Sequence, residues 1–464
     1  FYVEQGMYDF MRLHQPSLGV GANSFEDWVE RHVDRMNEMA ALAIYPETPH
    51  GVLDRFRIDE IVVVPDGALP LVPLPNEGQM DGQPNGSTTP NKDDRSVDLQ
   101  WGFPSAQTAY FTDLTTVSDQ NPFYLTGSLI HELGHARYLV DVYGWDVWTG
   151  GSDGSQVAIT EDGAPVAGSA LMPSSGQYVH FTTEQGLMNQ DYSFFDRYSA
   201  IVLNFIAGHR AIEGNFNDPD NEGSFLNDLP AQNRLTIRTA GGLPIPDADV
   251  RIYQATGVAG HFITKYYDDV PDLQLHTDAK GQVLVGRCPF SADGRIVHHF
   301  GGSNVTAIVR VEKDGAVSYG FLESRIFNLA FWAGHADFAD HDLFVGAPLC
   351  FPARAALLSP ALDATTPTRV VTLSWSGGGQ DITGYRVWLS SAGSPARLAG
   401  EVSAQTRSLD VEAQGRAAWW VETKHALCPP SRSQTEFFTA PGGSRPPLRV
   451  VPVLSPEPSR IAHP

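Results

Sequence analysis

The sequence predicts a multidomain protein in which a mixed α+β region is followed by two all-β sandwiches. The chain has 464 residues, 42% of them hydrophobic, and a single hydrophobic core does not grow to that size. Helical and strand periodicities mix up to about residue 228, whereas alternating apolar positions and short turns dominate beyond it. We therefore expect domains over residues 1–228, 229–352 and 353–441, and a proline-rich tail or linker over 442–464.

Charge and composition limit the classes of partner and the environments that the sequence predicts for the protein. The formal net charge is −23, and no lysine or arginine cluster is long enough to follow a phosphate backbone, so nucleic acid is excluded as a partner. The chain has no run of about eighteen apolar residues, so we expect no membrane-spanning segment. The three cysteines allow at most one disulfide, and Cys288 with Cys350 is the expected pair because both fall in the second domain.

The first region begins with a predicted amphipathic helix over residues 23–42, "NSFEDWVERHVDRMNEMAAL". Ser24 is placed as its N-cap, with Asp27 three residues later. The apolar residues recur at helical spacing and predict a buried stripe, namely Phe25, Trp28, Val29, Val33, Met36 and Met39.

Strands, a loop and a second helix are predicted next. The β-branched run Ile61–Val64 ends at Pro-Asp-Gly and predicts a buried strand. Residues 74–96 are rich in Pro, Gly, Asn and Asp and predict a long exposed loop. Residues 105–116, "SAQTAYFTDLTT", predict another strand, and a helix is expected from about Tyr124 onward.

The second and third regions carry the patterns of antiparallel β-sandwiches. Stretches such as "NVTAIVRVEKDGAVSYGFLE" alternate apolar residues between Asp-Gly and Lys-Gly turns about every ten residues. On "PDADVRIY" and "TDAKGQVLV", the second region resembles the prealbumin-like modules of secreted and surface proteins. In the third region, Trp375 on one strand, Tyr385 and Trp388 on the next and a late Trp-Trp-Val strand resemble a fibronectin type III domain.

The segment "SLIHELGHARYLVDVYG", residues 128–144, places two histidines and a glutamate within five positions. On a helix, residues four apart are separated by about 40° of rotation and about 6 Å along the axis, so His131 and His135 can direct ring nitrogens at one ion. Zinc accepts that geometry, and Glu132 beside them can reach a water bound to the ion. The alternative is a polar face of a core helix, in which both histidines would need other partners.

Asp141 is the candidate third zinc ligand, because a catalytic zinc needs three protein ligands and a water. In a continuous helix, Asp141 would lie about 15 Å along the axis from His131, beyond reach of the same ion. The chain must therefore reverse direction between His135 and Asp141.

The spacing of the two histidines, the glutamate and Asp141 resembles the metzincin metalloproteases, in the aspartate variant of their motif found in snapalysin-like members. The turn glycine of that family is replaced by Tyr138 here, and a bulky residue adopts the left-handed conformation at a cost of about 1 kcal/mol or more. The metal site would still form if the helix ended without a left-handed residue at position 138. A third ligand from a downstream carboxylate such as Glu184, as in thermolysin-like enzymes, is the alternative.

A second feature of the same family lies downstream. Gly186-Leu187-Met188 precedes a predicted helix with a Ser193/Asp196 start and apolar residues at helical spacing. This arrangement looks like the metzincin methionine turn and the closing helix behind it. The resemblance implies that Met188 lies beneath the metal without binding it.

The resemblance implies a secreted or surface-attached zinc endopeptidase that acts on protein or peptide substrates. In this hypothesis, zinc activates a water, Glu132 is the general base, and the strand at "TAYFTD" holds an extended substrate. Tyr192 is a candidate donor to the oxyanion. The β-sandwiches would position the enzyme or contact a matrix, a glycan or neighbouring subunits. The rival hypothesis is a structural surface protein, such as an adhesin or filament subunit, that retains a protease-like domain with little or no activity.

Two acidic clusters are weaker candidates for metal binding. Asp218, Asp220 and Glu222 have the spacing of the first half of a calcium-binding loop, but Leu229 stands where the closing glutamate belongs. A connection rich in Asp and Asn between domains is the alternative. The segment "GHADFADHDLF" over residues 334–344 predicts either a metal site at a sandwich edge or a solvated loop.

Overall fold

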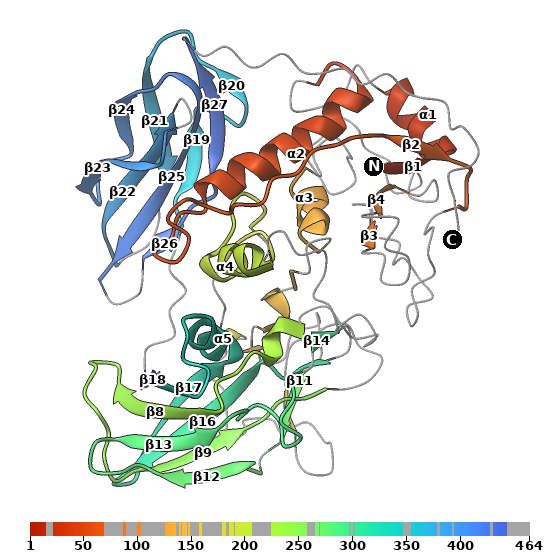
Figure 1. Cartoon of the computed structure of the whole chain (residues 1–464). Helices are drawn as coiled ribbons and strands as arrows, with labels where there is room; N and C mark the ends of the chain where they lie inside the picture. The colour runs from red at the N-terminus through yellow and green to blue at the C-terminus, as the bar shows by residue number, and fades with distance from the viewer. Residues whose placement is uncertain are drawn as a thin grey trace. The chain divides into compact units, whose positions relative to one another are not determined.

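The computed structural model divides the chain into two compact units (Figure 1). The first unit comprises Phe1–Leu139, Gln185–Pro219 and Pro352–Pro464, and the second comprises Val140–Glu184 and Asp220–Phe351. The C-terminal sandwich thus groups with the N-terminal region. The structure describes residues 1–14, 22–68, 87–89, 100–103, 126–135, 139–140, 142–145, 147–148, 157–159, 179–181, 185–189, 191–206, 224–257, 265–268, 270–296, 298–299, 302–346, 354–377, 381–391, 394–426 and 430–442.

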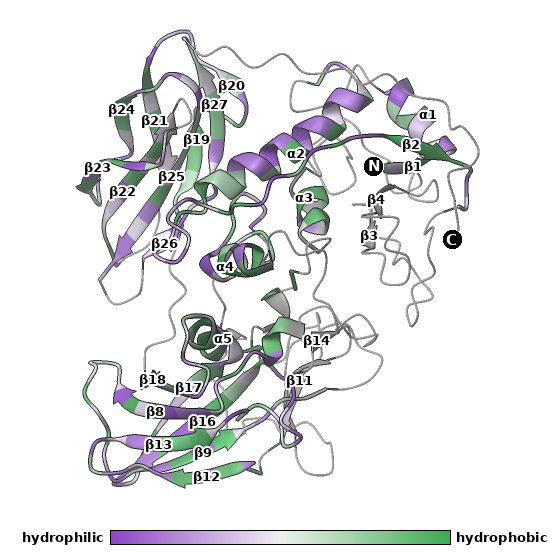
Figure 2. Cartoon of the chain, in the orientation of Figure 1, coloured by the Kyte–Doolittle hydropathy of each residue, from purple (hydrophilic) through white to green (hydrophobic). Residues whose placement is uncertain are grey.

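Helix α2 (Phe25–Leu42) confirms the predicted amphipathic helix. The Ser24 hydroxyl oxygen accepts a hydrogen bond from the Asp27 amide at 3.1 Å, which satisfies one of the N–H groups left open at a helix start. The apolar residues of the predicted stripe are all buried. The face of α2 visible in Figure 2 is mostly polar, as an amphipathic helix requires.

A four-stranded mixed sheet accompanies this helix, in the order β2-β1-β4-β3. Its elements are β1 (Tyr2–Glu4), β2 (Val62–Val64), β3 (Ser87–Thr89) and β4 (Gln100–Phe103), and α1 (Gln5–Leu13) follows β1 directly. Strand β1 is parallel to both β2 and β4, whereas β3 is antiparallel to β4.

Two predictions for this region need correction, and one is not tested. The strand predicted at Ile61–Val64 forms as β2, but it is only half-buried because it is the edge strand of the sheet. The predicted loop over 74–96 contains the short strand β3, because pairing with β4 gives its backbone hydrogen bonds. The strand predicted over residues 105–116 lies outside the described residues.

The second unit is built around a β-sandwich, as predicted. Its two sheets have the strand orders β12-β9-β16-β17 and β13-β8-β18, and β8 with β18 is the parallel pair in them. The hairpin between β16 and β17 turns at Asp314 and Gly315, whose φ values of +51° and +81° are the positive pair of a type I′ turn. The strands are β8 (Gln232–Thr239), β9 (Asp249–Tyr253), β12 (Leu273–His276), β13 (Gln282–Gly286), β16 (Thr306–Lys313), β17 (Ala316–Glu323) and β18 (Phe338–Val345).

Helix α5 (Ser324–Trp332) corrects the expectation of an almost purely β region. Its Asn328 side-chain amide donates to the carbonyls of Phe225 and Asp228, near the short 3₁₀ helix η5 (Ser224–Asn227). The Phe327 ring packs edge-on against Phe290. A nine-residue apolar stretch fits a strand as well as a helix, so periodicity did not distinguish the two.

Residues that follow the HELGH segment complete the core of the second unit. Val147 packs with Tyr253, Tyr267 and Ile308, and the Thr306 hydroxyl donates to the Trp145 carbonyl at 2.9 Å. Strand β6 pairs in parallel with β11, which pairs antiparallel with β10. The short elements are η4 (Val142–Trp145), β5 (Val147–Trp148), β6 (Val157–Ile159), β7 (Val179–Phe181), β10 (Thr256–Gly257), β11 (Lys265–Asp268), β14 (His298–His299) and β15 (Gly302–Ser303).

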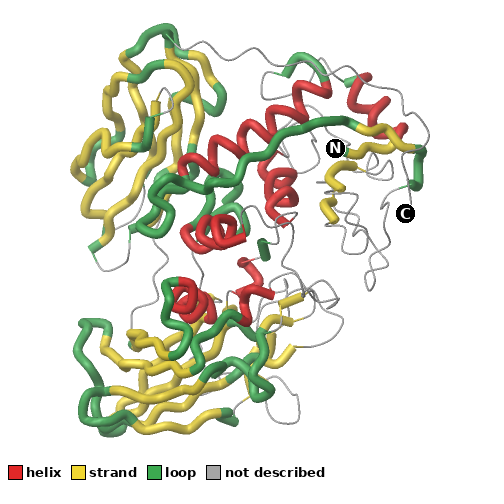
Figure 3. Tube along the Cα trace, in the orientation of Figure 1, coloured by secondary structure: helices red, strands yellow, loops and turns green. Residues whose placement is uncertain are grey.

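The C-terminal sandwich belongs to the first unit and packs the sheet β19-β21-β24 against a larger sheet, β20-β27-β25-β22-β23 with β26 beside β25. Its described residues form only strands and loops (Figure 3). The strands are β19 (Ala356–Ser359), β20 (Ala364–Thr365), β21 (Val370–Ser376), β22 (Ile382–Ser391), β23 (Arg397–Ser403), β24 (Ser408–Glu412), β25 (Gly415–His425), β26 (Ser431–Arg432) and β27 (Glu436–Ala440).

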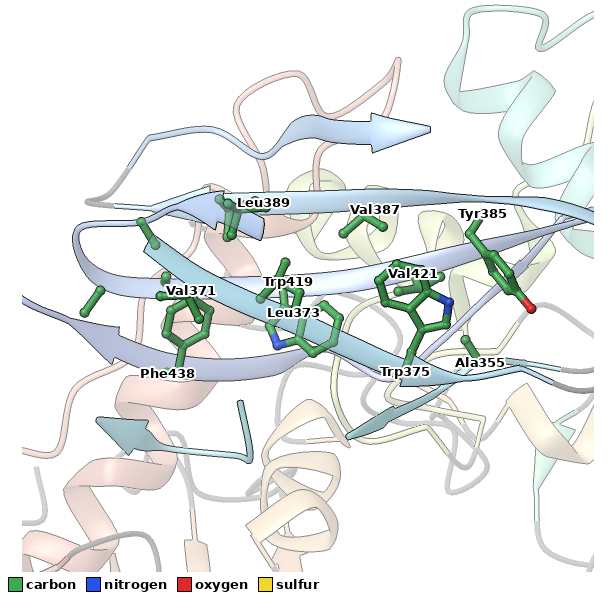
Figure 4. Packing of buried hydrophobic residues seen from close by; sticks show 14 residues of the cluster. Ala355, Val371, Leu373, Trp375, Tyr385, Val387, Leu389, Trp419, Val421 and Phe438 are labelled. Carbon is green, nitrogen blue, oxygen red and sulfur yellow. The ribbon is translucent and has the colours of Figure 1, made fainter. Parts of the chain in front are cut away.

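The core of this sandwich contains several of the aromatic residues on which its prediction rested. Trp375 and Tyr385 pack edge-on with ring centroids 5.7 Å apart, and Trp419 joins the same buried cluster (Figure 4). Trp388 lies elsewhere, because it stacks on Trp420 with centroids 6.1 Å apart and is only half-buried. The prediction of a second β-sandwich is confirmed.

Candidate metal centre

Helix α3 (Thr126–His135) carries the HELGH segment. Leu129, Ile130 and Leu133 are buried, so the helix is part of the core of the first unit. His131 is buried among them, with 5% of its surface exposed. The backbones of Glu132 and His135 lie in α3, and their side chains fall outside the described residues.

The His131 ring is oriented by a contact from far along the chain. Its Nδ1 atom lies 2.8 Å from the Leu187 carbonyl oxygen. A carbonyl oxygen only accepts hydrogen bonds, so Nδ1 carries the proton and donates it. In the neutral ring, the lone pair is then on Nε2, which is the arrangement that orients a histidine ligand toward a metal. His131 therefore fits the role of a zinc ligand.

Met188 lies directly under the motif helix. A Cβ atom placed on Gly134 would be 2.9 Å from the Met188 sulfur and 3.7 Å from a methyl carbon of Leu187, so a side chain at this helix position would force Met188 to move. Met188 itself is fully buried. The glycine of HELGH is thus explained by packing, a requirement that the sequence pattern did not indicate.

The turn that carries Met188 is tight, and backbone hydrogen bonds hold it both internally and to Phe194. The Asn189 amide donates to the Gly186 carbonyl at 2.8 Å, and the Leu187 amide donates to the Phe194 carbonyl at 2.7 Å. A Cβ atom on Gly186 would lie 2.7 Å from the Asp196 backbone nitrogen. The turn therefore needs glycine at its first position.

Helix α4 (Arg197–Ile206) follows this turn, as predicted, but its start signal is different. The Asp196 carboxylate accepts from the Ser199 amide at 2.9 Å and so caps the helix. Ser193 instead donates from its hydroxyl to Asp191 at 2.7 Å. Phe205, one of the apolar residues at helical spacing in this helix, is 45% exposed.

Tyr192 lies beside the motif histidine. Its ring packs edge-on against the His131 ring, with centroids 5.6 Å apart and an interplanar angle of 79°. The side chain is 39% exposed. Tyr192 is thus placed where it can contact both solvent and a group bound at His131.

The chain is no longer helical at Leu139 and Val140. Leu139 and Val140 have no regular secondary structure, and the Leu139 amide donates to the Gly134 carbonyl at 3.3 Å. A hydrogen bond across five residues closes many helix C-termini. The motif helix has therefore ended before Leu139, whereas the chain reversal that the third-ligand hypothesis requires involves residues outside the described ones. Tyr138, Asp141 and Glu184 lie outside the described residues.

The remaining candidate sites are corrected or left untested. Residues 218, 220 and 222 of the calcium hypothesis lie outside the described residues. Cys288 has a free thiol, which does not support the expected pair with Cys350, itself outside the description. Among the described residues, no group of three or more His, Cys, Asp or Glu side chains is placed to hold a metal.

From Phe338 onward the cluster over 334–344 forms strand β18, and no three of its His and Asp side chains are placed to hold a metal, so the metal hypothesis there is not supported. On β18, Asp340 and Asp342 point to the exposed face, where they pair with Arg234 and Arg238. His341 points the other way, with Nε2 2.9 Å from the Asn233 amide oxygen, and burial lowers its pKa to about 4. Alternation along the strand separates the groups that the sequence places side by side.

No known family model matches the chain, and no curated protein matches it. Among solved structures, the fibronectin(III)-like modules of Clostridium thermocellum CbhA match at 11% identity and a TM-score of 0.17, over 42% of this chain and 77% of theirs. A β-1,2-glucanase from Parabacteroides distasonis matches at 15% identity and a TM-score of 0.17, over 47% of this chain and 28% of the glucanase. TM-scores this low carry no argument about fold or function. Within the described residues, no helix is both long and apolar enough to cross a bilayer.

Proposed function

We propose that the protein is a zinc endopeptidase of metzincin type, either secreted or attached to a surface. The main support is one contact: the Leu187 carbonyl accepts the Nδ1 proton of His131 and so directs Nε2 as a zinc ligand needs. The turn that supplies this carbonyl also packs the Met188 sulfur against Gly134 of the motif helix. A histidine on the polar face of an ordinary core helix would also need a partner for its ring nitrogen, but it would not need a methionine turn packed against the same helix.

The residues have distinct roles in this proposal. His131, His135 and Asp141 would hold the zinc, which, when bound, polarises a water molecule and the scissile carbonyl. Glu132 takes the proton from the water and passes it to the leaving amine. The Tyr192 hydroxyl donates a hydrogen bond to the oxyanion, a role supported by its ring contact with His131 and its partial exposure.

Metal analysis and one substitution test the proposal. We expect about one zinc per chain in purified protein, and Glu132→Ala to lower the rate of casein cleavage by about 10²–10⁴-fold while zinc stays bound. Glu401→Ala, which removes an exposed glutamate of the C-terminal sandwich, is the matched control and should retain full activity. Full activity of Glu132→Ala, or full activity after complete removal of metal, would overturn the mechanism.

The alternative function is a structural surface protein that keeps a protease-like site, and it is favoured by the two β-sandwiches and by Tyr138 at the turn position. This alternative predicts bound zinc without turnover. Cleavage of any sequence in a broad peptide library by the wild-type protein, lost in Glu132→Ala, would exclude it.

A further inference from the structure

Residues 191–194, here called the 191–194 segment, directly follow the Met188 turn and include Tyr192. Tyr192 contacts the His131 ring, as described above. The three residues around it, Asp191, Ser193 and Phe194, each contact the C-terminal sandwich, which lies in the same compact unit. This segment therefore links the candidate metal centre to a module more than 150 residues away in the chain.

Asp191 is the strongest of these links because its carboxylate is buried, with 1% of the residue exposed. Its Oδ2 atom lies 2.7 Å from Nη1 of Arg354, and its Oδ1 atom accepts from the Ser193 hydroxyl at 2.7 Å. Arg354 lies two residues before β19 of the C-terminal sandwich. A buried carboxylate that loses its cation is strongly unfavourable, so Arg354 holds the segment at this point.

Phe194 and Ser193 provide a second attachment to the same sandwich. The Arg432 guanidinium of β26 lies 3.9 Å from the centroid of the Phe194 ring and 4.2 Å from that of Trp420. A planar guanidinium between two aromatic faces gains cation–π and stacking energy. In addition, the Thr435 amide donates to the Ser193 hydroxyl oxygen at 2.8 Å.

The sandwich is also attached to helix α2, so contacts at the 191–194 segment are not its only support. Arg416 pairs with Glu38 at 2.8 Å and with Asp363 at 2.6 Å, and Arg35 of α2 pairs with Asp363 at 2.7 Å. Both guanidinium groups lie over the Phe437 ring. The sandwich therefore contacts the N-terminal region at two separate places.

We propose that the C-terminal β-sandwich is a positioning module for the candidate metal centre. Arg354 and Arg432 act as positioning residues that hold the 191–194 segment and thereby keep Tyr192 against His131. The catalytic consequence rests on the proposed function, whereas the ordering of the segment by the sandwich does not. Fibronectin-like modules on flexible tethers would have no such effect.

A kinetic experiment on the full chain tests the catalytic consequence. Arg354→Met should lower kcat about tenfold with KM changed less than about twofold, because a misplaced oxyanion donor weakens transition-state binding. Zinc content should not change, Arg354→Lys should recover most of kcat, and Arg354→Met should add little to the loss caused by Tyr192→Phe. Arg386→Met, on an exposed arginine of the same sandwich, is the matched control. Wild-type kcat in Arg354→Met, or an equal loss in the control, would overturn the proposal.

Amide hydrogen exchange tests the ordering without any need for proteolysis. In the protein with Arg354→Met and Arg432→Met, we expect the Leu187 and Asp191 amides, which bond to Phe194 and Gly186, to exchange at least about tenfold faster, while amides of β21 do not change. Adding Asp191→Asn removes the unpaired buried charge and guards against global unfolding. Unchanged exchange at both amides would overturn the positioning role, whereas full activity of Glu132→Ala would overturn only the proposed function.

Discussion

The two β-sandwiches are joined to neighbouring segments by different kinds of contact. In the sandwich of the second unit, Val147 belongs to a buried hydrophobic cluster with Tyr267 and Ile308, and Trp145 in the same unit is completely buried. The C-terminal sandwich contacts α2 and the 191–194 segment through charged side chains, chiefly Arg354 and Arg416.

This difference in contacts predicts which parts of the molecule should change in stability when the salt concentration or the pH changes. Apolar burial depends little on salt or pH, whereas partly exposed ion pairs weaken as salt screens them. We therefore expect the contacts that hold the residues after the motif helix to depend little on salt concentration. The 191–194 segment should be more sensitive to salt, because Arg354 and Arg432 are among the residues that hold it.

The largest effect on stability is expected for Trp145→Ala, which tests the hydrophobic contacts of the second unit. Removal of a fully buried indole should lower the free energy of unfolding of the second unit by about 3–5 kcal/mol. Urea denaturation with a separate probe in each unit should show the first unit unchanged. Phe344→Ala, on a half-exposed side chain of the same sandwich, should change stability by less than about 0.5 kcal/mol. Equal losses in both units would break the comparison.

A smaller effect is expected for Gly134→Ala, which acts on the first unit alone. The new methyl group would lie 2.9 Å from the Met188 sulfur, and such overpacking costs about 1–3 kcal/mol. Zinc affinity should fall as well, because the turn that orients His131 must move. Met188→Ala in the same chain should recover part of the loss, and Gly241→Ala, where a Cβ atom would make only an ordinary 3.7 Å contact with the Thr239 hydroxyl oxygen, should be neutral. A neutral Gly134→Ala would contradict the packing of Met188 under the helix.

The pH dependence of the first unit depends on two buried groups with opposite signs. Burial lowers the pKa of His32 to about 4, so its contribution to stability falls as pH drops from about 6.5 to 4. Burial raises the pKa of Glu436 to about 7, so its contribution to stability rises as pH drops from about 7 to 4.5. The two effects offset each other over most of this range.

Glu436→Gln should therefore expose the acid sensitivity of His32. We expect the variant to lose about 1–2 kcal/mol of stability, relative to wild type, between pH 7.5 and pH 5, after allowance for solvent screening. The second unit contains the buried His341 with a pKa of about 4 and should lose stability on acidification in both proteins. Denaturation curves at a series of pH values measure this. Parallel pH profiles for variant and wild type would rule out the role of Glu436.

The smallest effect on stability is expected for Arg416→Met, which tests the ion pairs of the C-terminal sandwich. Its ion pairs with Glu38 and Asp363 are partly exposed, so the loss should be about 1 kcal/mol in low salt and should shrink as salt is added. Titration with NaCl at fixed urea measures it. A loss that does not change up to about 1 M salt would show that packing of the arginine on Phe437, and not charge, holds the contact.

Several parts of the fold could be predicted because their causes lie close together in the chain. The Ser24 cap and the buried stripe of α2 depend on residues three and four apart, and the Asp314-Gly315 turn depends on two neighbours. Helix α5 escaped prediction because a short apolar stretch suits either type of element. The metal site considered as one alternative near His341 does not form, because a strand sends adjacent side chains to opposite faces.

The sequence by itself determined the HELGH spacing on a helix, the methionine after it and the two β-sandwiches, because these follow from local periodicity and turn chemistry. Only the tertiary structure decided that the Leu187 carbonyl orients His131, that Met188 packs against Gly134, and that Arg354 neutralises Asp191. The physical reason is separation along the chain. Leu187 lies 56 residues from His131, and Arg354 lies 163 residues from Asp191. No local pattern encodes which distant groups meet, since that depends on how whole elements pack.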